Sequence, residues 1–153
     1  MELAIMAPAF AAFQKIPERF SRDRGNRSPQ LEWRGRPQKL VASRSDPDAP
    51  KGTFRHWAAY NIPAEAETLP EGAGSHPPGA NMRMRMANND FGNSHYYGPQ
   101  PPRGSGIHHY YFGIFALDVP ELDVPANGEV DDVLQAAQMH ALAEADTVGV
   151  FER

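Results

Sequence analysis

The chain has 153 residues, of which 41% are hydrophobic and 22% charged, a composition that fits one globular domain over residues 1–153. It contains no cysteine, which excludes disulfides, thiolate metal sites and cysteine nucleophiles. Its net charge of -4 argues against nucleic acid as a partner, and no apolar run reaches the roughly eighteen residues of a membrane span.

Charge is unevenly distributed along the chain. Residues 1–44 carry nine Lys or Arg against four acids, whereas residues 118–153 carry one against nine. The asymmetry is typical of solvated faces of opposite sign, and it is also compatible with a head-to-tail homodimer. The first residues hold an acid at Glu2 and no basic residue before their apolar stretch, a poor secretory signal, so we expect a cytoplasmic protein.

Three segments predict strands and two predict loops. Residues 19–36 carry six arginines among Ser, Gly, Asn and Pro and predict a loop with a basic surface. Residues 40–43, 53–62 and 107–117 are predicted to form strands. The last two segments are rich in aromatic and β-branched residues, which favour strands. Turn residues recur between 72 and 106 and indicate a long structured loop. Within it, Met82, Met84 and Met86 alternate with arginines as in a half-buried strand.

The C-terminal part predicts a helix over residues 130–145 and a short strand over 147–151. Asp131 and Asp132 fall in the first helical turn, where acids are favourable, and an apolar stripe runs from Val130 to Ala141. Mostly strands with one late helix indicate a mainly β fold. We therefore expect an antiparallel β-sandwich with a C-terminal β–α–β addition.

Chemistry can come only from His, Asp, Glu, Tyr or the backbone. The prolines of Asp46–Pro50 (DPDAP) fix a turn that presents Asp46 and Asp48, although such a turn is also common on plain surfaces. His56 lies inside a predicted strand, where a histidine is often a core residue. His108 and Tyr110 share one strand face and His109 the other. Immediately before His108, residues 98–106 hold three glycines and three prolines, a composition that suits a rigid backbone nest for an anion.

These segments, taken together and in this order, resemble the phosphatidylethanolamine-binding protein family, in its bacterial Raf-kinase-inhibitor-like branch. The resemblance runs from about Phe20 to Arg153 and rests on the following segments: NRSPQLEW (26–33), DPDAP (46–50), HWAAYNIP (56–63), NDFGNSHYYGPQPPRG (89–104), IHHY (107–110) and the closing LAEADTVGVFER. It implies a Greek-key β-sandwich with a small site for anions such as phosphate groups, phospholipid head groups or phosphorylated peptides.

The resemblance also implies which residues form that site. Asp46, His56 and His108 would be its polar wall, with Asp48 in support and the Tyr110 hydroxyl beside them. Pro101, Pro102 and the backbone from Gly104 to Gly106 would shape its rim, and Phe54 and Trp57 would add apolar wall. No cofactor or metal is expected. His108 and His109 lie on opposite faces of one strand and cannot readily share an ion.

The chain departs from the family pattern at three places. His109 stands where the family usually has arginine, and Gln100 replaces the usual cysteine of the proline-rich loop. The segment between Pro37 and Asp46 is about three residues shorter than is common in the bacterial branch, which affects the placement of Asp46.

The expected function is a non-enzymatic binding protein for a phosphate-bearing ligand, which could modulate a kinase or another signalling partner. Because imidazole changes its charge near neutral pH, binding is expected to weaken as the pH rises through the histidine range. The alternatives are a hydrolase that uses Asp46 with His56 or His108 as general base, and a protease inhibitor. No GxSxG or other nucleophile motif supports the first, and no local segment identifies the second.

Overall fold

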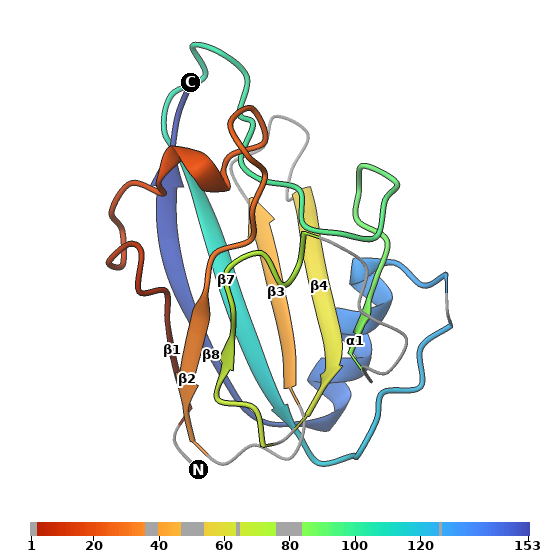
Figure 1. Ribbon diagram of the computed structural model, residues 1–153. Coiled ribbons are helices and arrows are strands. Elements are labelled where there is room, and N and C mark those ends of the chain that lie inside the picture. Colours follow the sequence, from red (N-terminus) through yellow and green to blue (C-terminus); the bar gives the residue numbers. More distant parts are fainter. Residues whose placement is uncertain (1–2, 36–39, 47–53, 64, 76–83, 126) are drawn as a thin grey trace.

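In the residues that it describes, the computed structural model has two antiparallel sheets, one α-helix and one short 3-10 helix, η1 (Figure 1). It describes residues 3–35, 40–46, 54–63, 65–75, 84–125 and 127–153, with only the backbone described at 40–46 and 54. The small sheet has the order β1-β2-β5 and the large sheet β6-β4-β3-β7-β8. The elements are β1 Ala4–Met6, η1 Glu18–Phe20, β2 Leu31–Arg34, β3 Leu40–Asp46, β4 Phe54–Ile62, β5 Thr68–Leu69, β6 Arg85–Met86, β7 His108–Leu117, α1 Val130–His140 and β8 Ala141–Phe151.

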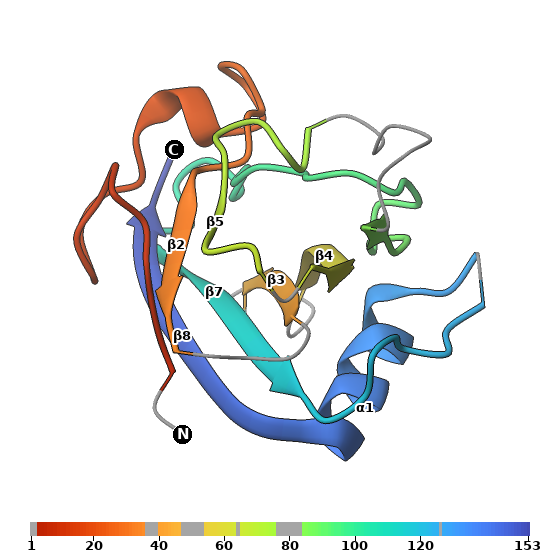
Figure 2. The ribbon, with the colours of Figure 1, turned by 60° about the horizontal axis from the view of Figure 1, so that its bottom comes forward.

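The main core lies between the two sheets. The small sheet covers the concave face of the large one, and α1 packs against the opposite face (Figure 2). Alternation along β7 directs Tyr110, Phe112 and Ile114 into this core, as expected for a strand with side-chain period two. Leu31 and Trp33 of β2 close the core from the small sheet. The expected mainly β, two-layer architecture is therefore confirmed.

A second cluster joins the outer face of the large sheet to α1. Val130, Val133 and Ala137 of the helix are buried against Ala58 and Tyr60 of β4. The predicted apolar stripe therefore does face the sheet, and the strand–helix–strand order at the C-terminus is confirmed. The two strands that α1 connects, β7 and β8, are antiparallel neighbours.

The predicted end of the helix is wrong. The helix ends at His140, and residues 141–145 form the first half of β8. They pair with Leu117 to Ile114 of β7, so backbone hydrogen bonds to a long neighbouring strand outweigh the helix propensity of a segment rich in Ala, Leu and Glu. The predicted strand over 147–151 is the second half of β8.

The three predicted strands are confirmed, with β3 extending to Asp46. Residues 19–36, predicted as one loop, contain part of η1 and the whole of β2. In β2 the buried side chains of Leu31 and Trp33 alternate with Glu32 and Arg34, a pattern too short to stand out among six arginines. Met84 and Met86 are buried around exposed Arg85, as the alternation predicted, while Met82 lies outside the described residues.

Among the described residues, no helix is both long and apolar enough to cross a membrane.

The start of α1 offers a test of the helix assignment. The Glu129 backbone N–H donates to Asp132 Oδ2 at 2.9 Å, half of a capping box. Asp132→Ala should lower the free energy of unfolding by about 1 kcal/mol, measured by urea denaturation. Gln138→Ala, on an exposed position of the same helix, should leave it within about 0.5 kcal/mol. Equal losses in both variants would contradict the capping role.

Candidate functional site

A β-bulge places His56 in the interior. On β3, Arg44 pairs with Trp57 and the next residue, Ser45, pairs with Arg55, so His56 is one extra residue on β4. A bulge of this kind redirects a side chain. Arg55 points outward to Asp131 of α1, whereas His56 and Trp57 are both buried. His56 therefore lies on the inner face of the sheet, whereas strict alternation from Trp57 would place it on the outer face.

His108 and Tyr110 lie at the start of β7 and are buried on the same face. The Tyr110 ring neighbours both histidine rings: its centroid is 5.8 Å from that of His56, edge to face, and 6.4 Å from that of His108, nearly parallel. His56 comes from β4 and His108 from β7, with β3 between them in the sheet. We call His56, His108 and Tyr110 the histidine cluster.

One nitrogen of each imidazole has a described partner on the protein. His56 Nδ1 lies 2.9 Å from the Tyr97 carbonyl oxygen. A carbonyl can only accept, so Nδ1 carries the hydrogen. His108 Nε2 lies 2.9 Å from Ser105 Oγ, on the loop that precedes β7.

The loop from Gly98 to Ile107 forms a rim beside the cluster. Gly104 and Gly106 have φ angles of 76° and 88°, a region that favours glycine, and they bracket Ser105. Ser105 Oγ donates to the Pro102 carbonyl at 2.6 Å. Of the predicted rim residues, Pro102 is connected to His108 through Ser105. Pro101 is buried, and Pro102 and Gly104 are exposed.

Arg153 holds this rim in place. Its Nε donates to the Pro101 carbonyl at 2.6 Å, and its Nη1 lies 2.9 Å from Asp23 Oδ2. Hydrogen bonds from Gln100 and Arg153 lower the pKa of Asp23 below its ordinary value, so the carboxylate form is favoured. The ion pair ties the basic loop of residues 19–27 to the rim, on the end of the molecule that carries the histidine cluster.

A stack of planar groups forms one side of the site. The rings of Phe91 and Tyr97 are stacked at 3.4 Å, and the Arg22 guanidinium lies 4.7 Å from the Tyr97 centroid. The Phe91 ring is edge-on to His56 at 5.3 Å and is 40% exposed. The exposed Phe91 ring therefore lies beside His56, and Arg22 lies over Tyr97, whose ring centroid is 6.3 Å from that of His56.

Two asparagines that the sequence analysis did not single out fix these segments. Buried Asn89 donates through Nδ2 to the carbonyls of His56 and His95, and its Oδ1 accepts from the backbone of Phe91. Asn26, at φ 53°, donates to the Tyr96 carbonyl and accepts from the Gly98 backbone. The turn signal of the NDFGN segment could have indicated the first. Nothing in the sequence pattern indicated the second.

Some predicted site residues lie elsewhere or outside the described part. Asp46 ends β3, paired with Phe54, but the side chains of both residues lie outside the described set, and so does the whole of Asp48. Trp57 packs in the core against Tyr96 and donates to Met86 Sδ. His109 is half-buried on the opposite face from His108, as alternation predicted. The described residues contain no group of three or more His, Asp or Glu that could hold a metal ion.

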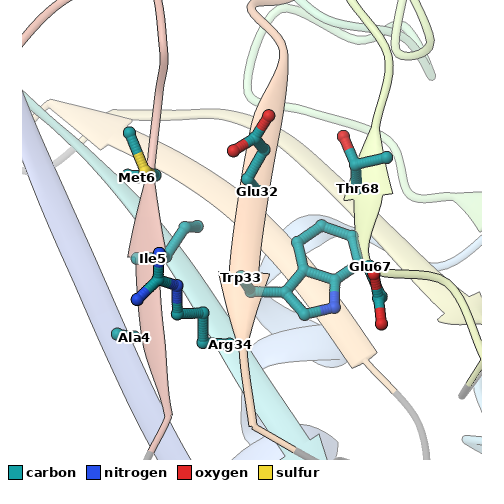
Figure 3. Close-up of a pocket in the computed structure, with 8 residues that line it drawn as sticks. All are labelled: Ala4, Ile5, Met6, Glu32, Trp33, Arg34, Glu67 and Thr68. Carbon is teal, nitrogen blue, oxygen red and sulfur yellow. The ribbon is translucent and has the colours of Figure 1, made fainter.

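A separate groove follows the small sheet, where β1, β2 and β5 lie side by side (Figure 3). The carboxylates of Glu32 and Glu67 lie on it beside Arg34 and Trp33. Two carboxylates against one guanidinium disfavour an anion there. None of the described residues that line the groove is a histidine, so the histidine cluster is the better candidate for phosphate.

Comparison with known proteins shows the family to which the chain belongs. A family model described as phosphatidylethanolamine-binding protein matches residues 6–152. A UPF0098 protein of Aquifex aeolicus is 34% identical over 99% of this chain and 89% of its own length. YbhB of Escherichia coli, also a UPF0098 protein, is 35% identical over 84% of each chain.

Solved structures show the same fold. YbcL of Escherichia coli, described as a member of the mammalian PEBP family, superposes with a TM-score of 0.91 at 27% identity and covers 100% of this chain and 99% of its own. The phosphatidylethanolamine-binding protein homologue CT736 of Chlamydia trachomatis has a TM-score of 0.85 at 28% identity, with 99% and 97% covered.

Proposed function

We propose that this chain, which belongs to the phosphatidylethanolamine-binding protein family, is a non-enzymatic binding protein that takes a phosphate-bearing ligand at the histidine cluster. The observation that carries the proposal is the meeting of two buried histidines from separate strands on one tyrosine. Imidazolium groups donate strong, charge-assisted hydrogen bonds to phosphate oxygens. Buried next to a rigid rim, they are already placed, so binding orders little else.

The surroundings support an anion as the ligand. Arg22 lies over the ring of Tyr97, whose carbonyl accepts from His56, while Arg24 and Arg103 line a depression together with Arg153, next to the rim. Glu18, Asp23 and Glu152 lie in the same depression. Glu18 is paired with Lys15, and Asp23 is paired with Arg153. Exposed arginines near the site raise the local concentration of anions in a salt-dependent way.

The hydrolase alternative gains no support from Ser105, whose hydroxyl contacts His108. Its proton is directed to the Pro102 carbonyl at 2.6 Å, and the contact with His108 is therefore one in which the serine accepts. A serine nucleophile would instead have to donate to the histidine that deprotonates it.

A kinase or protease partner, a homodimer and a cytoplasmic location are separate parts of the proposal. Light scattering tests the dimer and cell fractionation tests the location. The latter is needed because a relative from Mycobacterium tuberculosis, 34% identical over 98% of this chain, is named as a lipoprotein.

Isothermal titration calorimetry tests the ligand class. We expect phosphate, phosphoethanolamine and sulfate each to bind saturably at pH 6, and ethanolamine, which lacks the anion, to give no binding. Sulfate should bind more weakly at pH 8, because imidazole loses its charge over this range while sulfate keeps its own. If no anion gives saturable heat at pH 6, the proposal is wrong. If phosphoethanolamine binds and is consumed, the protein is an enzyme.

A further inference from the structure

The two histidines of the cluster are held by different parts of the loop that precedes β7. His56 Nδ1 donates to the Tyr97 carbonyl at 2.9 Å, and the Tyr97 ring centroid lies 6.3 Å from that of His56. His108 contacts Ser105 on the rim at 2.9 Å. An anion that contacts both imidazoles therefore needs Tyr97 and Ser105 to keep a fixed separation.

Gln100 follows Tyr97 by three residues, and both ends of its side-chain amide are engaged. Its Nε2 donates to Asp23 Oδ1 at 2.8 Å, and its Oε1 accepts from the Tyr97 hydroxyl at 3.1 Å. Because a carboxylate can only accept, Asp23 determines which end of the amide faces which partner. The amide oxygen is thereby directed to the Tyr97 hydroxyl.

Asp23 continues this connection to the rest of the rim. Its Oδ2 accepts from Arg153 Nη1 at 2.9 Å. Arg153 in turn donates through Nε to the Pro101 carbonyl at 2.6 Å, and its own carbonyl accepts from the Gly104 N–H at 3.3 Å. The Asp23 carboxylate thus links Gln100 to the part of the rim that contacts the histidine cluster.

We propose that Gln100 is a positioning residue of the anion site, which holds Tyr97 against the rim and so keeps His56 and His108 at the spacing that the anion needs. The inference rests on the proposed function, because it concerns the same site. Gln100 acts through Tyr97 and is not itself a ligand. Its effect is on affinity, since binding orders fewer groups when the two sides of a site are already fixed.

Backbone contacts in the same segment do not depend on the Gln100 side chain. The Arg22 N–H donates to the Pro99 carbonyl at 3.0 Å, and the Gly98 N–H donates to Asn26 Oδ1. Gln100 is only half-buried, so removal of its amide opens no large cavity. A variant that lacks the amide should therefore keep the fold and lose the fixed position of Tyr97.

Isothermal titration calorimetry with sulfate at pH 6 measures the effect on affinity. Gln100→Ala is expected to bind sulfate about fivefold more weakly than the native chain, the effect of losing one hydrogen bond. Circular dichroism and urea unfolding should stay close to native. Gln30→Ala is the matched control and should keep native sulfate affinity. Gln30 is also half-buried, and its Nε2 donates to a carboxylate, Glu32 Oε1, at 3.0 Å, but beside the small sheet.

A double-mutant cycle with Tyr97→Phe shows whether Gln100 acts through the Tyr97 hydroxyl. Phenylalanine lacks the hydroxyl from which Gln100 accepts. Gln100→Ala should therefore weaken sulfate binding less in the Tyr97→Phe background than in the native chain. A side chain that contributed only stability or local charge would cause the same loss in both backgrounds. Equal losses would overturn the inference.

Gln100→Glu adds a pH profile that packing alone would not give. A protonated glutamic acid can donate to Asp23 and accept from Tyr97, as the amide does, whereas the ionised form cannot donate. A proton between two carboxyl groups is held more tightly than usual, and nearby arginines oppose this; these are Arg22, Arg24, Arg103 and Arg153. Relative to the native chain at each pH, sulfate affinity should be about fivefold lower at pH 8 and recover toward native at pH 5.

The charge-matched control Gln30→Glu should follow the native chain at both pH values. A deficit in Gln100→Glu that is equal at pH 5 and pH 8 would contradict the positioning role, and this profile decides the question even if Gln100→Ala fails to fold. If the native chain binds neither sulfate nor phosphate at pH 6, the proposed function itself fails. If the native chain binds sulfate and Gln100→Ala binds it equally well, only the inference about Gln100 is wrong.

Discussion

Replacing His108 with alanine is expected to weaken phosphate and sulfate binding by about 10- to 100-fold at pH 6, the loss that follows from removing a charge-assisted hydrogen bond. His108 belongs to the histidine cluster through its contact with Tyr110, and alanine removes the ring that would carry the donated proton. Titration calorimetry at pH 6 measures the loss. Circular dichroism on the same samples shows whether the fold survives the cavity left by a buried ring.

A second variant separates charge from packing. His108→Gln keeps a polar donor of similar size but no titratable charge, so sulfate affinity should be low at both pH 6 and pH 8 and should depend less on pH than in the native chain. His140→Ala is the matched control, because His140 pairs with Asp118 beyond the opposite end of β7. Native affinity in His108→Ala would place the anion away from the histidine cluster.

The strand pattern around His108 is an example of what sequence alone predicts well. Along β7 the residues from His108 to Leu117 alternate between two faces, and the face that holds His108 and Tyr110 follows from the side-chain period of two. The two faces differ in what covers them, since Phe112 packs in the inter-sheet core and Phe115 in the cluster under α1. Both covering layers are apolar. The sequence therefore predicts the alternation, but it does not predict which face of β7 packs toward the small sheet and which toward α1.

His56 shows why the same logic fails one strand away. Alternation from Trp57 would direct His56 to the outer face, together with Ala58 and Tyr60. The bulge opposite Arg44 and Ser45 reverses this, and a bulge depends on the register of two strands that are not adjacent in sequence until they fold. Only the family resemblance, and not the residue pattern, brought His56 and His108 to one site.

The C-terminal end of the helix illustrates competition between local and tertiary preferences. Residues 141–145 (ALAEA) favour a helix on propensity alone, yet they pair with Leu117 to Ile114 of β7. Nothing in those five residues specifies the partner, because the partner strand lies more than twenty residues earlier in the chain. Ser105 is similar: its role depends on the Pro102 carbonyl and on His108 three positions later, and a serine between two glycines by itself indicates only a turn.

Asn89→Asp is expected to cause the largest loss of stability among single-atom changes near the site, about 2–4 kcal/mol in the free energy of unfolding. Asn89 is buried, and its Nδ2 is within hydrogen-bonding distance of three oxygens, the His56 carbonyl at 3.1 Å, Asn93 Oδ1 at 2.8 Å and the His95 carbonyl at 2.9 Å. Aspartate would place an oxygen where the amide nitrogen was. An ionised carboxylate has no hydrogen to offer these acceptors.

Besides lowering the free energy of unfolding of the whole chain, Asn89→Asp should loosen the loop at residue 89 where it contacts His56. Asn89 Oδ1 accepts from the backbone of Phe91 and Asn93, and aspartate can keep these two bonds, so the loop should retain its turn while separating from β4 at His56. Urea denaturation measures the global loss. Hydrogen exchange should show faster opening at the Asp90 amide, which donates to the Arg55 carbonyl, and calorimetry should show weaker sulfate binding because His56 is less well held.

Asn88→Asp is the matched control for Asn89→Asp, with the same chemical change one residue earlier. Its side chain donates only one described bond, at 3.1 Å to the exposed Asn127 carbonyl, and water can replace that partner at little cost. A loss below about 0.5 kcal/mol is therefore expected. If the two variants were equally stable, burial of Asn89 among three acceptors would not be what holds the loop on β4. The rigidity of the histidine cluster would then have to come from the Phe91, Tyr97 and Arg22 stack instead.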